Sequence, residues 1–161
     1  MAALALLGAC GFQPLYGQRG ADGVPVEFSQ IRVDPIPDRI GQQLHNRLLT
    51  ALNPKGRAAK PRYVMTTRVT ESSTSLAVRK SAFATRANLV VKAEFSLSEA
   101  DGGKPLLSAD SSITVSYNIL DSEFATLMAV KDARTRAVRE IGEDIRLRLG
   151  AFFASRRGDG R

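Results

Sequence analysis

Three consecutive segments between residues 63 and 119 alternate apolar and polar side chains, and this alternation constrains the fold more than any other feature. Every second residue of 87–97 is apolar, and the same spacing covers 107–119 with Ser111 as its interruption. A period of two is typical of strands with one buried face. The turn Asp101-Gly102-Gly103 suits a hairpin, because glycine adopts the positive φ that such turns need. We therefore expect three antiparallel strands that share one apolar and one polar face.

Helical spacing appears on both sides of these strands. Before them, an apolar residue recurs every four positions between Ile40 and Leu52, after Asp38 as a possible N-cap and before Asn53-Pro54 as a stop. After them, a longer helix is expected from Asp121 onward, and its apolar side must cover part of the sheet. That side consists of Phe124, Leu127, Val138, Ile141, Ile145, Leu149 and Phe152.

The remaining apolar segment, Val24 to Val33, is extended in character and ends before Pro35, so we expect it to be the first strand. The two helical stripes and the apolar sheet face are all buried if both helices lie on one side of the sheet. The sequence therefore predicts an α+β two-layer sandwich over residues 24–154. Its four-stranded sheet is mostly antiparallel, in the order strand, helix, three strands, helix. Residues 70–85 form either extended hairpin arms, which we favour, or a long loop.

The N-terminus has the features of an export signal. Residues 2–9 are all Ala, Leu or Gly, and Leu7-Gly8-Ala9-Cys10 fits the pattern at which bacterial lipoproteins are cleaved and lipidated. We interpret residues 1–9 as part of a longer signal peptide, because no basic residue precedes the apolar run. Cys10 is then the lipid attachment site, and residues 10–23 form a link to the domain. The alternative is a chance thiol in a disordered tail.

Basic residues are concentrated in one part of the chain. The net charge is +7, and residues 55–92 contain nine Lys or Arg and a single acid, Glu71. Such a concentration favours an anionic partner such as a phosphate, a lipid head group or nucleic acid. The alternative is a solvated face that keeps the protein soluble. The last residues, 155–161, contain two further arginines before the C-terminal Arg161, and we expect them to form a mobile basic tail.

The sequence contains no recognisable catalytic or metal-binding constellation. His45 is the single histidine and Cys10 the single cysteine, so neither a Cys/His nucleophilic pair nor a zinc site can be assembled from them. We expect no enzymatic activity, no metal and no cofactor. A nucleic-acid-binding domain is the alternative that the charge suggests. The absence of Trp and of paired aromatic residues on the strands argues against it, as does the export signal.

The segment Cys10-Gly11-Phe12-Gln13-Pro14-Leu15-Tyr16-Gly17 resembles the start of the lipopolysaccharide-assembly lipoproteins of Gram-negative bacteria, the LptE family, in its alphaproteobacterial form. The expected order of elements is similar to that family as well. The resemblance implies a lipid-anchored protein on the periplasmic face of the outer membrane. Such a protein plugs the β-barrel lipopolysaccharide translocon, an LptD-like partner, and is not an enzyme. An adaptor of another envelope complex is the alternative.

Under this resemblance two sets of residues become candidates for binding. The charge count and the expected hairpin suggest lipopolysaccharide contacts at Arg79, Lys80 and Arg86, with exposure to solvent or to the barrel wall as the alternative. Phe12, Pro14, Leu15 and Tyr16, in the segment that carries the resemblance, are expected to pack against the domain or the barrel rather than to contact a ligand. The implied partners are therefore the barrel, lipopolysaccharide and the membrane through the N-terminal lipid, and not nucleic acid.

Overall fold

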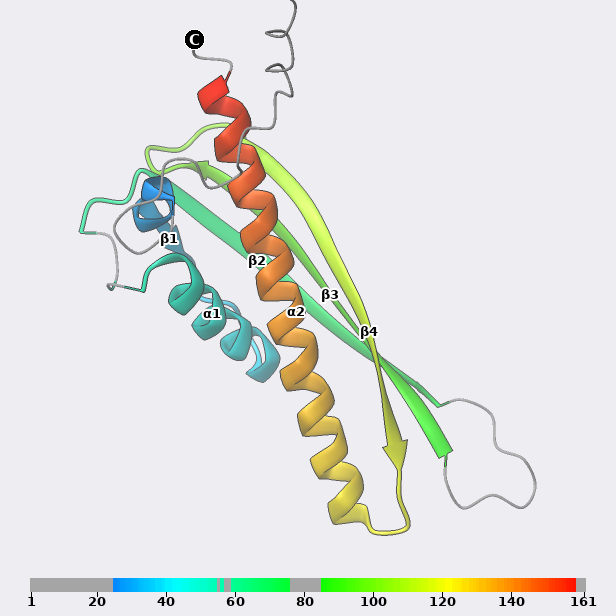
Figure 1. The fold of residues 1–161 in the computed structure, drawn as a ribbon. Coiled ribbons are helices and arrows are strands. Elements are labelled where there is room, and N and C mark those ends of the chain that lie inside the picture. The colour runs from blue at the N-terminus through cyan, green and yellow to red at the C-terminus, as the bar shows by residue number, and fades with distance from the viewer. Residues whose placement is uncertain (1–24, 55, 57–58, 76–84, 159–161) are drawn as a thin grey trace, which may run out of the picture.

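The fold is an α+β two-layer sandwich, as predicted (Figure 1). The computed structural model describes residues 25–54, 56, 59–75 and 85–158. Four strands form one sheet in the order β1-β2-β3-β4, with β1 parallel to β2 and the other pairs antiparallel, and both helices lie on one face of it. The elements are a 3₁₀-helix η1 (Val26–Gln30), β1 (Ile31–Val33), α1 (Arg39–Leu52), β2 (Tyr63–Ser75), β3 (Thr85–Glu99), β4 (Leu107–Ile119) and α2 (Glu123–Gly158).

Strand register places the alternating apolar residues on the face beneath the helices. Met65 lies opposite Leu97 and Leu89 opposite Val115, and all four are buried. Residues 70–75 pair with residues 87–92, so the extended hairpin arms are confirmed up to Ser75 and from Thr85. The segment that joins them, with Arg79 and Lys80, lies outside the described residues.

The prediction of a strand from Val24 to Val33 is wrong for most of its length. Residues 26–30 form η1, in which Phe28 N donates to Pro25 O at 3.0 Å and Ser29 Oγ donates to Val26 O at 2.7 Å. The tight turn carries the Phe28 ring into the core, where its centroid lies 6.3 Å from that of Phe153. Burial of this aromatic ring overrides the extended preference of its neighbours, and β1 keeps only three residues.

Helix α1 follows the sequence prediction except at its N-terminus. Ile40, Leu44, Leu48 and Leu52 are buried against the sheet and α2. Asp38 does occupy the N-cap position, but its side chain makes no capping hydrogen bond and its φ is 65°. The backbone instead closes the first turn, since Gln42 N donates to Asp38 O at 2.9 Å.

Helix α2 differs from the prediction at both ends. Phe124 and Leu127, expected in the core, are 71% and 57% exposed, because α1 lies beside the middle of α2 and leaves its first turns uncovered (Figure 1). At the other end Phe153 is buried and Phe152 only partly so. The helix continues to Gly158, so residues 155–158 belong to it rather than to a tail, and residues 159–161 lie outside the described part.

Candidate functional site

The sheet face away from the helices is polar and nearly balanced in charge. On β2, β3 and β4 it carries Arg68, Arg86 and Lys92 against Glu94 and Asp110, and no aromatic residue among those described. Lys92 Nζ lies 2.9 Å from Glu94 Oε1, and this hydrogen bond lowers the pKa of Glu94 and raises that of Lys92. The basic excess of residues 55–92 therefore does not produce a continuous basic face on the described strands.

Arg86 is the one predicted lipopolysaccharide contact that the structure describes. It is exposed near the start of β3, opposite Asn118 of β4, and forms no ion pair with any described residue. The next outward pair toward the centre of the sheet is neutral, since Ser116 Oγ donates to Asn88 Oδ1 at 2.8 Å. The Arg86 guanidinium is thus available for an anion.

An apolar cluster lies at the same end of the molecule. Thr85 pairs with Ile119, so Arg86 and the residue that follows β4, Leu120, come from adjacent strand ends. The exposed large apolar side chains here are Leu120, Phe124, Leu127 and Met128, from the β4–α2 turn and the first turns of α2. We call these four residues the distal surface, together with Arg86, which lies at the same end of the molecule but on the sheet face away from α2.

Local hydrogen bonds fix the turn that presents the apolar side chains. Leu120 N donates to Thr126 Oγ1 at 2.9 Å, and the same hydroxyl donates to Leu120 O at 3.1 Å. Ala125 N donates to Ser122 Oγ at 3.3 Å, as in an N-cap. Because the backbone is held in this way, the exposure of Phe124 and Leu127 belongs to an ordered helix start. Exposed apolar clusters on ordered elements mark interaction sites.

Strand β2, the hairpin arm that pairs with the Arg86-bearing β3, is tied to α2. Arg134 donates two hydrogen bonds to the Glu71 carboxylate of β2, at 2.9 and 2.8 Å, and Ser73 Oγ lies 2.7 Å from the Tyr117 hydroxyl on β4. Paired hydrogen bonds between a guanidinium and a carboxylate add geometric specificity. They hold β2, β4 and α2 in one arrangement, so the cation and the apolar part of the distal surface keep their relative positions.

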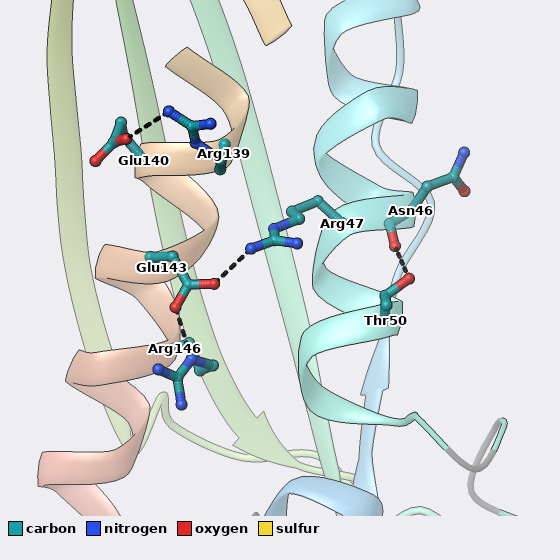
Figure 2. Close-up of polar contacts among 7 residues, drawn as sticks. All are labelled: Asn46, Arg47, Thr50, Arg139, Glu140, Glu143 and Arg146. Atoms are coloured by element: carbon teal, nitrogen blue, oxygen red, sulfur yellow. Dashed lines mark hydrogen bonds and ion pairs between the residues drawn. The ribbon is translucent and has the colours of Figure 1, made fainter. Parts of the chain in front are cut away.

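A second polar cluster joins α1 to α2 (Figure 2). Arg47 Nη2 lies 2.6 Å from Glu143 Oε1, and Arg146 Nε lies 2.9 Å from Glu143 Oε2. The hydrogen bond from Arg146, with the charges of Arg146 and Arg47, holds the pKa of Glu143 below its ordinary value. Gly142 permits the approach, since a Cβ there would lie 2.8 Å from Arg47 Cγ. Each of these charges has an opposite charge beside it, so this cluster stabilises helix packing and is not a ligand site.

The remaining predicted site residues lie outside the described part of the chain, namely Cys10, Phe12, Pro14, Leu15, Tyr16, Arg79 and Lys80. Among the described residues no group of three or more His, Cys, Asp or Glu could hold a metal ion. No helix there is both long enough and apolar enough to cross a membrane. Sequence reasoning missed the exposed apolar cluster. One signal in the sequence pointed to it, namely that the apolar stripe of residues 124–152 is far longer than the stripe of residues 40–52.

Comparisons with known proteins give one matching family model and several solved structures of similar fold. A family model named LptE and described as lipopolysaccharide-assembly matches residues 28–149. A search of curated proteins gives no match. Several solved structures have a similar fold. A candidate lipoprotein of Caulobacter crescentus CB15 is 20% identical, with 81% of this chain and 94% of that chain covered and a TM-score of 0.62. Lipoprotein B of Nitrosomonas europaea is 15% identical, with 77% and 82% covered and a TM-score of 0.55, and a minor lipoprotein of Acinetobacter baumannii is 12% identical, with 77% and 94% covered and a TM-score of 0.53.

Proposed function

Since this chain belongs to the LptE family of lipopolysaccharide-assembly lipoproteins, whose members are not enzymes, we propose that it plugs and supports the β-barrel that carries lipopolysaccharide to the cell surface. The partner would be an LptD-like outer-membrane protein. The polar outer face of the sheet supports this proposal, because the lumen of a large barrel is polar. A plug needs a surface of this kind on the side that meets the barrel wall.

We place the protein on the periplasmic face of the outer membrane, anchored through a lipid on Cys10. Residues 1–9 would belong to the signal peptide, and residues 10–23 would connect the lipid to the domain that begins at residue 24. The lipoprotein character of the family supports the anchor. More than one acyl chain is required for stable attachment, since a single chain binds a membrane only marginally.

The distal surface is the observation that supports direct binding of lipopolysaccharide. It combines the Arg86 guanidinium, which has no ion-pair partner among the described residues, with the exposed side chains of Leu120, Phe124, Leu127 and Met128. Lipopolysaccharide offers the matching chemistry, with phosphates beside acyl chains. Arg79 and Lys80 would extend the cationic part, because they belong to the segment between the two arms of the same hairpin.

Affinity purification of the full-length protein from mildly solubilised outer membranes tests both parts of this function. After a high-salt wash we expect a large β-barrel protein in near-equal amount, together with bound lipopolysaccharide. The double variant Arg86→Glu with Leu127→Asp should keep the barrel and lose the lipopolysaccharide severalfold. A matched control on the far half of α2, Leu147→Asp with Arg148→Glu, changes the same residue types and should keep both.

The outcomes separate the two parts of the proposal. Recovery of the protein alone, or with a different envelope complex, would contradict the plug function and favour an adaptor of that complex. Recovery of the barrel with lipopolysaccharide that is equally bound by the distal variant would retain the plug and remove the ligand from the distal surface.

A further inference from the structure

Strand β1 forms one edge of the described sheet, and part of that edge has no hydrogen-bonding partner. Asp34 N donates to Met65 O of β2 at 2.9 Å, so in this parallel pair the preceding residue, Val33, directs its N–H and C=O away from β2. Ile31 also faces outward, but its carbonyl accepts a hydrogen bond from Asn53 Nδ2 at 3.0 Å. Among the described residues, Val33 therefore presents the unpaired donor and acceptor of this edge. Such an edge is a template for an added chain.

A cavity of about 260 Å³ lies between this edge and α1, and we call it the β1–α1 cleft. Val33, His45, Leu49 and Asn53 are among its lining residues, and His45 Nδ1 lies 3.1 Å from Asp34 O. Since a cavity of about 150 Å³ accommodates benzene, this one has room for a larger apolar side chain.

Asn53 supplies a second sign that the cleft is incomplete. The residue is only 7% exposed, and its amide nitrogen is used by Ile31 O, yet its Oδ1 is buried without a partner among the described residues. A buried acceptor that lacks a donor costs free energy, and native structures rarely leave one unpaired. The cleft thus offers an acceptor at Asn53, an acceptor and a donor at Val33, and apolar wall at Leu49.

The nearest chain that could complete the cleft is the protein's own N-terminal segment. Residues 12–16 combine the apolar side chains Phe12, Leu15 and Tyr16 with Pro14, which favours an extended backbone. Residues 17–24 connect them to Pro25, contain three glycines and can span up to about 26 Å. From Pro25 to Val33 the chain advances at most about 20 Å, through five 3₁₀ residues and three strand residues. The connection is therefore long enough to return residues 12–16 to β1.

We propose that residues 12–16 of this chain lie along the open edge of β1 and fill the β1–α1 cleft. Their main chain pairs with Val33, a donor from the segment reaches Asn53 Oδ1, and an apolar side chain packs against Leu49. This inference rests on the cleft and not on the proposed function. It would hold Cys10 within two residues of a docked segment, so the attachment point would stay beside the domain.

Hydrogen exchange of the Val33 amide tests the docking, measured by NMR in the full chain with Cys10→Ser to prevent lipidation. We expect the amide to exchange at least about tenfold more slowly than in the same chain with Phe12→Ser, Leu15→Ser and Tyr16→Ser, because docking must open before exchange. The control Gln18→Ser with Arg19→Ser changes the connection alone and should keep the protection. A peptide of residues 11–19 added to the triple variant should restore it, and the peptide with the three serines should not.

Equal exchange in the full chain and the triple variant would overturn the proposal, whether the rate is fast or slow. Fast exchange in both would mean that the cleft holds only water. Slow exchange in both would mean that another chain covers the edge, and if dilution removes the protection that chain is a second copy. Thermal melting of each variant checks that the fold is intact, since all substituted positions precede the described domain.

Discussion

At the scale of single residues, glycines mark the closest approaches between elements. A Cβ on Gly41 of α1 would lie 2.6 Å from Ile36 Cγ2 and 3.1 Å from the Ile36 backbone, whereas one on Gly150 of α2 would lie 3.8 Å from the nearest atom of Phe28. Gly150 is buried, eight residues before the helix ends. Composition alone does not distinguish a glycine that a close contact requires from one that a side chain could replace.

Gly41→Ala and Gly150→Ala should therefore have opposite effects on the free energy of unfolding. Alanine favours a helix over glycine by about 1 kcal/mol, so we expect Gly150→Ala to stabilise the domain by about 0.5–1 kcal/mol. At Gly41 overpacking of about 1–3 kcal/mol against backbone opposes that gain, and we expect a net loss of up to about 2 kcal/mol. Urea unfolding measures both values. A Gly41→Ala protein more stable than wild type would show that Ile36 can move aside.

Glu143 should make stability depend on pH. Its pKa is lowered in the folded protein, so its contribution is complete above the ordinary glutamate pKa of about 4.3 and is lost as the pH falls through the lower folded pKa. Glu143→Gln should therefore lower the free energy of unfolding at pH 7 by up to about 1 kcal/mol, the range of a half-exposed pair. The difference from wild type should shrink toward zero in strong acid.

The control for that experiment is Glu140→Gln, because among the described residues Glu140 forms its ion pair with the neighbouring Arg139, at 3.3 Å, and not with α1. Its unfolding curves should match wild type at both pH values. A Glu143→Gln difference that stays constant from pH 7 into acid would mean that shape, and not charge, holds α1 to α2 at this position.

At the scale of elements, the two helices have very different lengths. α1 has 14 residues and α2 has 36, which correspond to about 21 Å and 54 Å. Helical spacing in the sequence predicts both helices and the stripe that packs each against the sheet. It does not predict where α1 stops covering α2, because that depends on how the two lie side by side. For the same reason β1 could not be bounded from sequence, since the burial of Phe28 depends on the distant Phe153.

This length difference should divide α2 into a part that is required for folding and a part that is not. Ile141 is fully buried, so Ile141→Asp should abolish the cooperative thermal transition by placing a charge in the core. Leu127→Asp makes the same change on an exposed turn and should alter the free energy of unfolding by less than about 0.5 kcal/mol. Loss of folding in Leu127→Asp would place the first turns of α2 in the folding core.

At the scale of the whole molecule, the period-two segments predict the sandwich and its polar outer face correctly, because the alternation is local. The candidate site was less accessible to such reasoning. Arg86, a candidate from the sequence, is exposed, but Phe124 and Leu127 of the distal surface were expected in the core. These apolar side chains are exposed because α1 does not reach the first turns of α2, and this depends on how the helices pack. The cleft beside β1 depends likewise on hydrogen bonds that only the three-dimensional structure shows.

At this scale we also predict that membrane attachment depends on the sulfur atom of Cys10. Cys10→Ser should move the protein from the membrane fraction to the soluble fraction, because the thiol is the lipid acceptor that the sequence offers. Gln13→Ser, three residues away, should leave it in the membrane. Both proteins should have the melting temperature of wild type, since the described core begins after residue 24. Membrane retention of Cys10→Ser would contradict the anchor.

The ion pair between Glu27 and Arg157, at 3.6 Å, has a geometric consequence for the distal surface. It places the start of the described domain beside the C-terminal end of α2, so that start and the distal surface lie at opposite ends of the helix. The helix is about 54 Å long, whereas the hydrocarbon layer of a bilayer is about 30 Å thick. A molecule held at the distal surface would therefore lie farther from the start of the described domain than the hydrocarbon layer of a bilayer is thick.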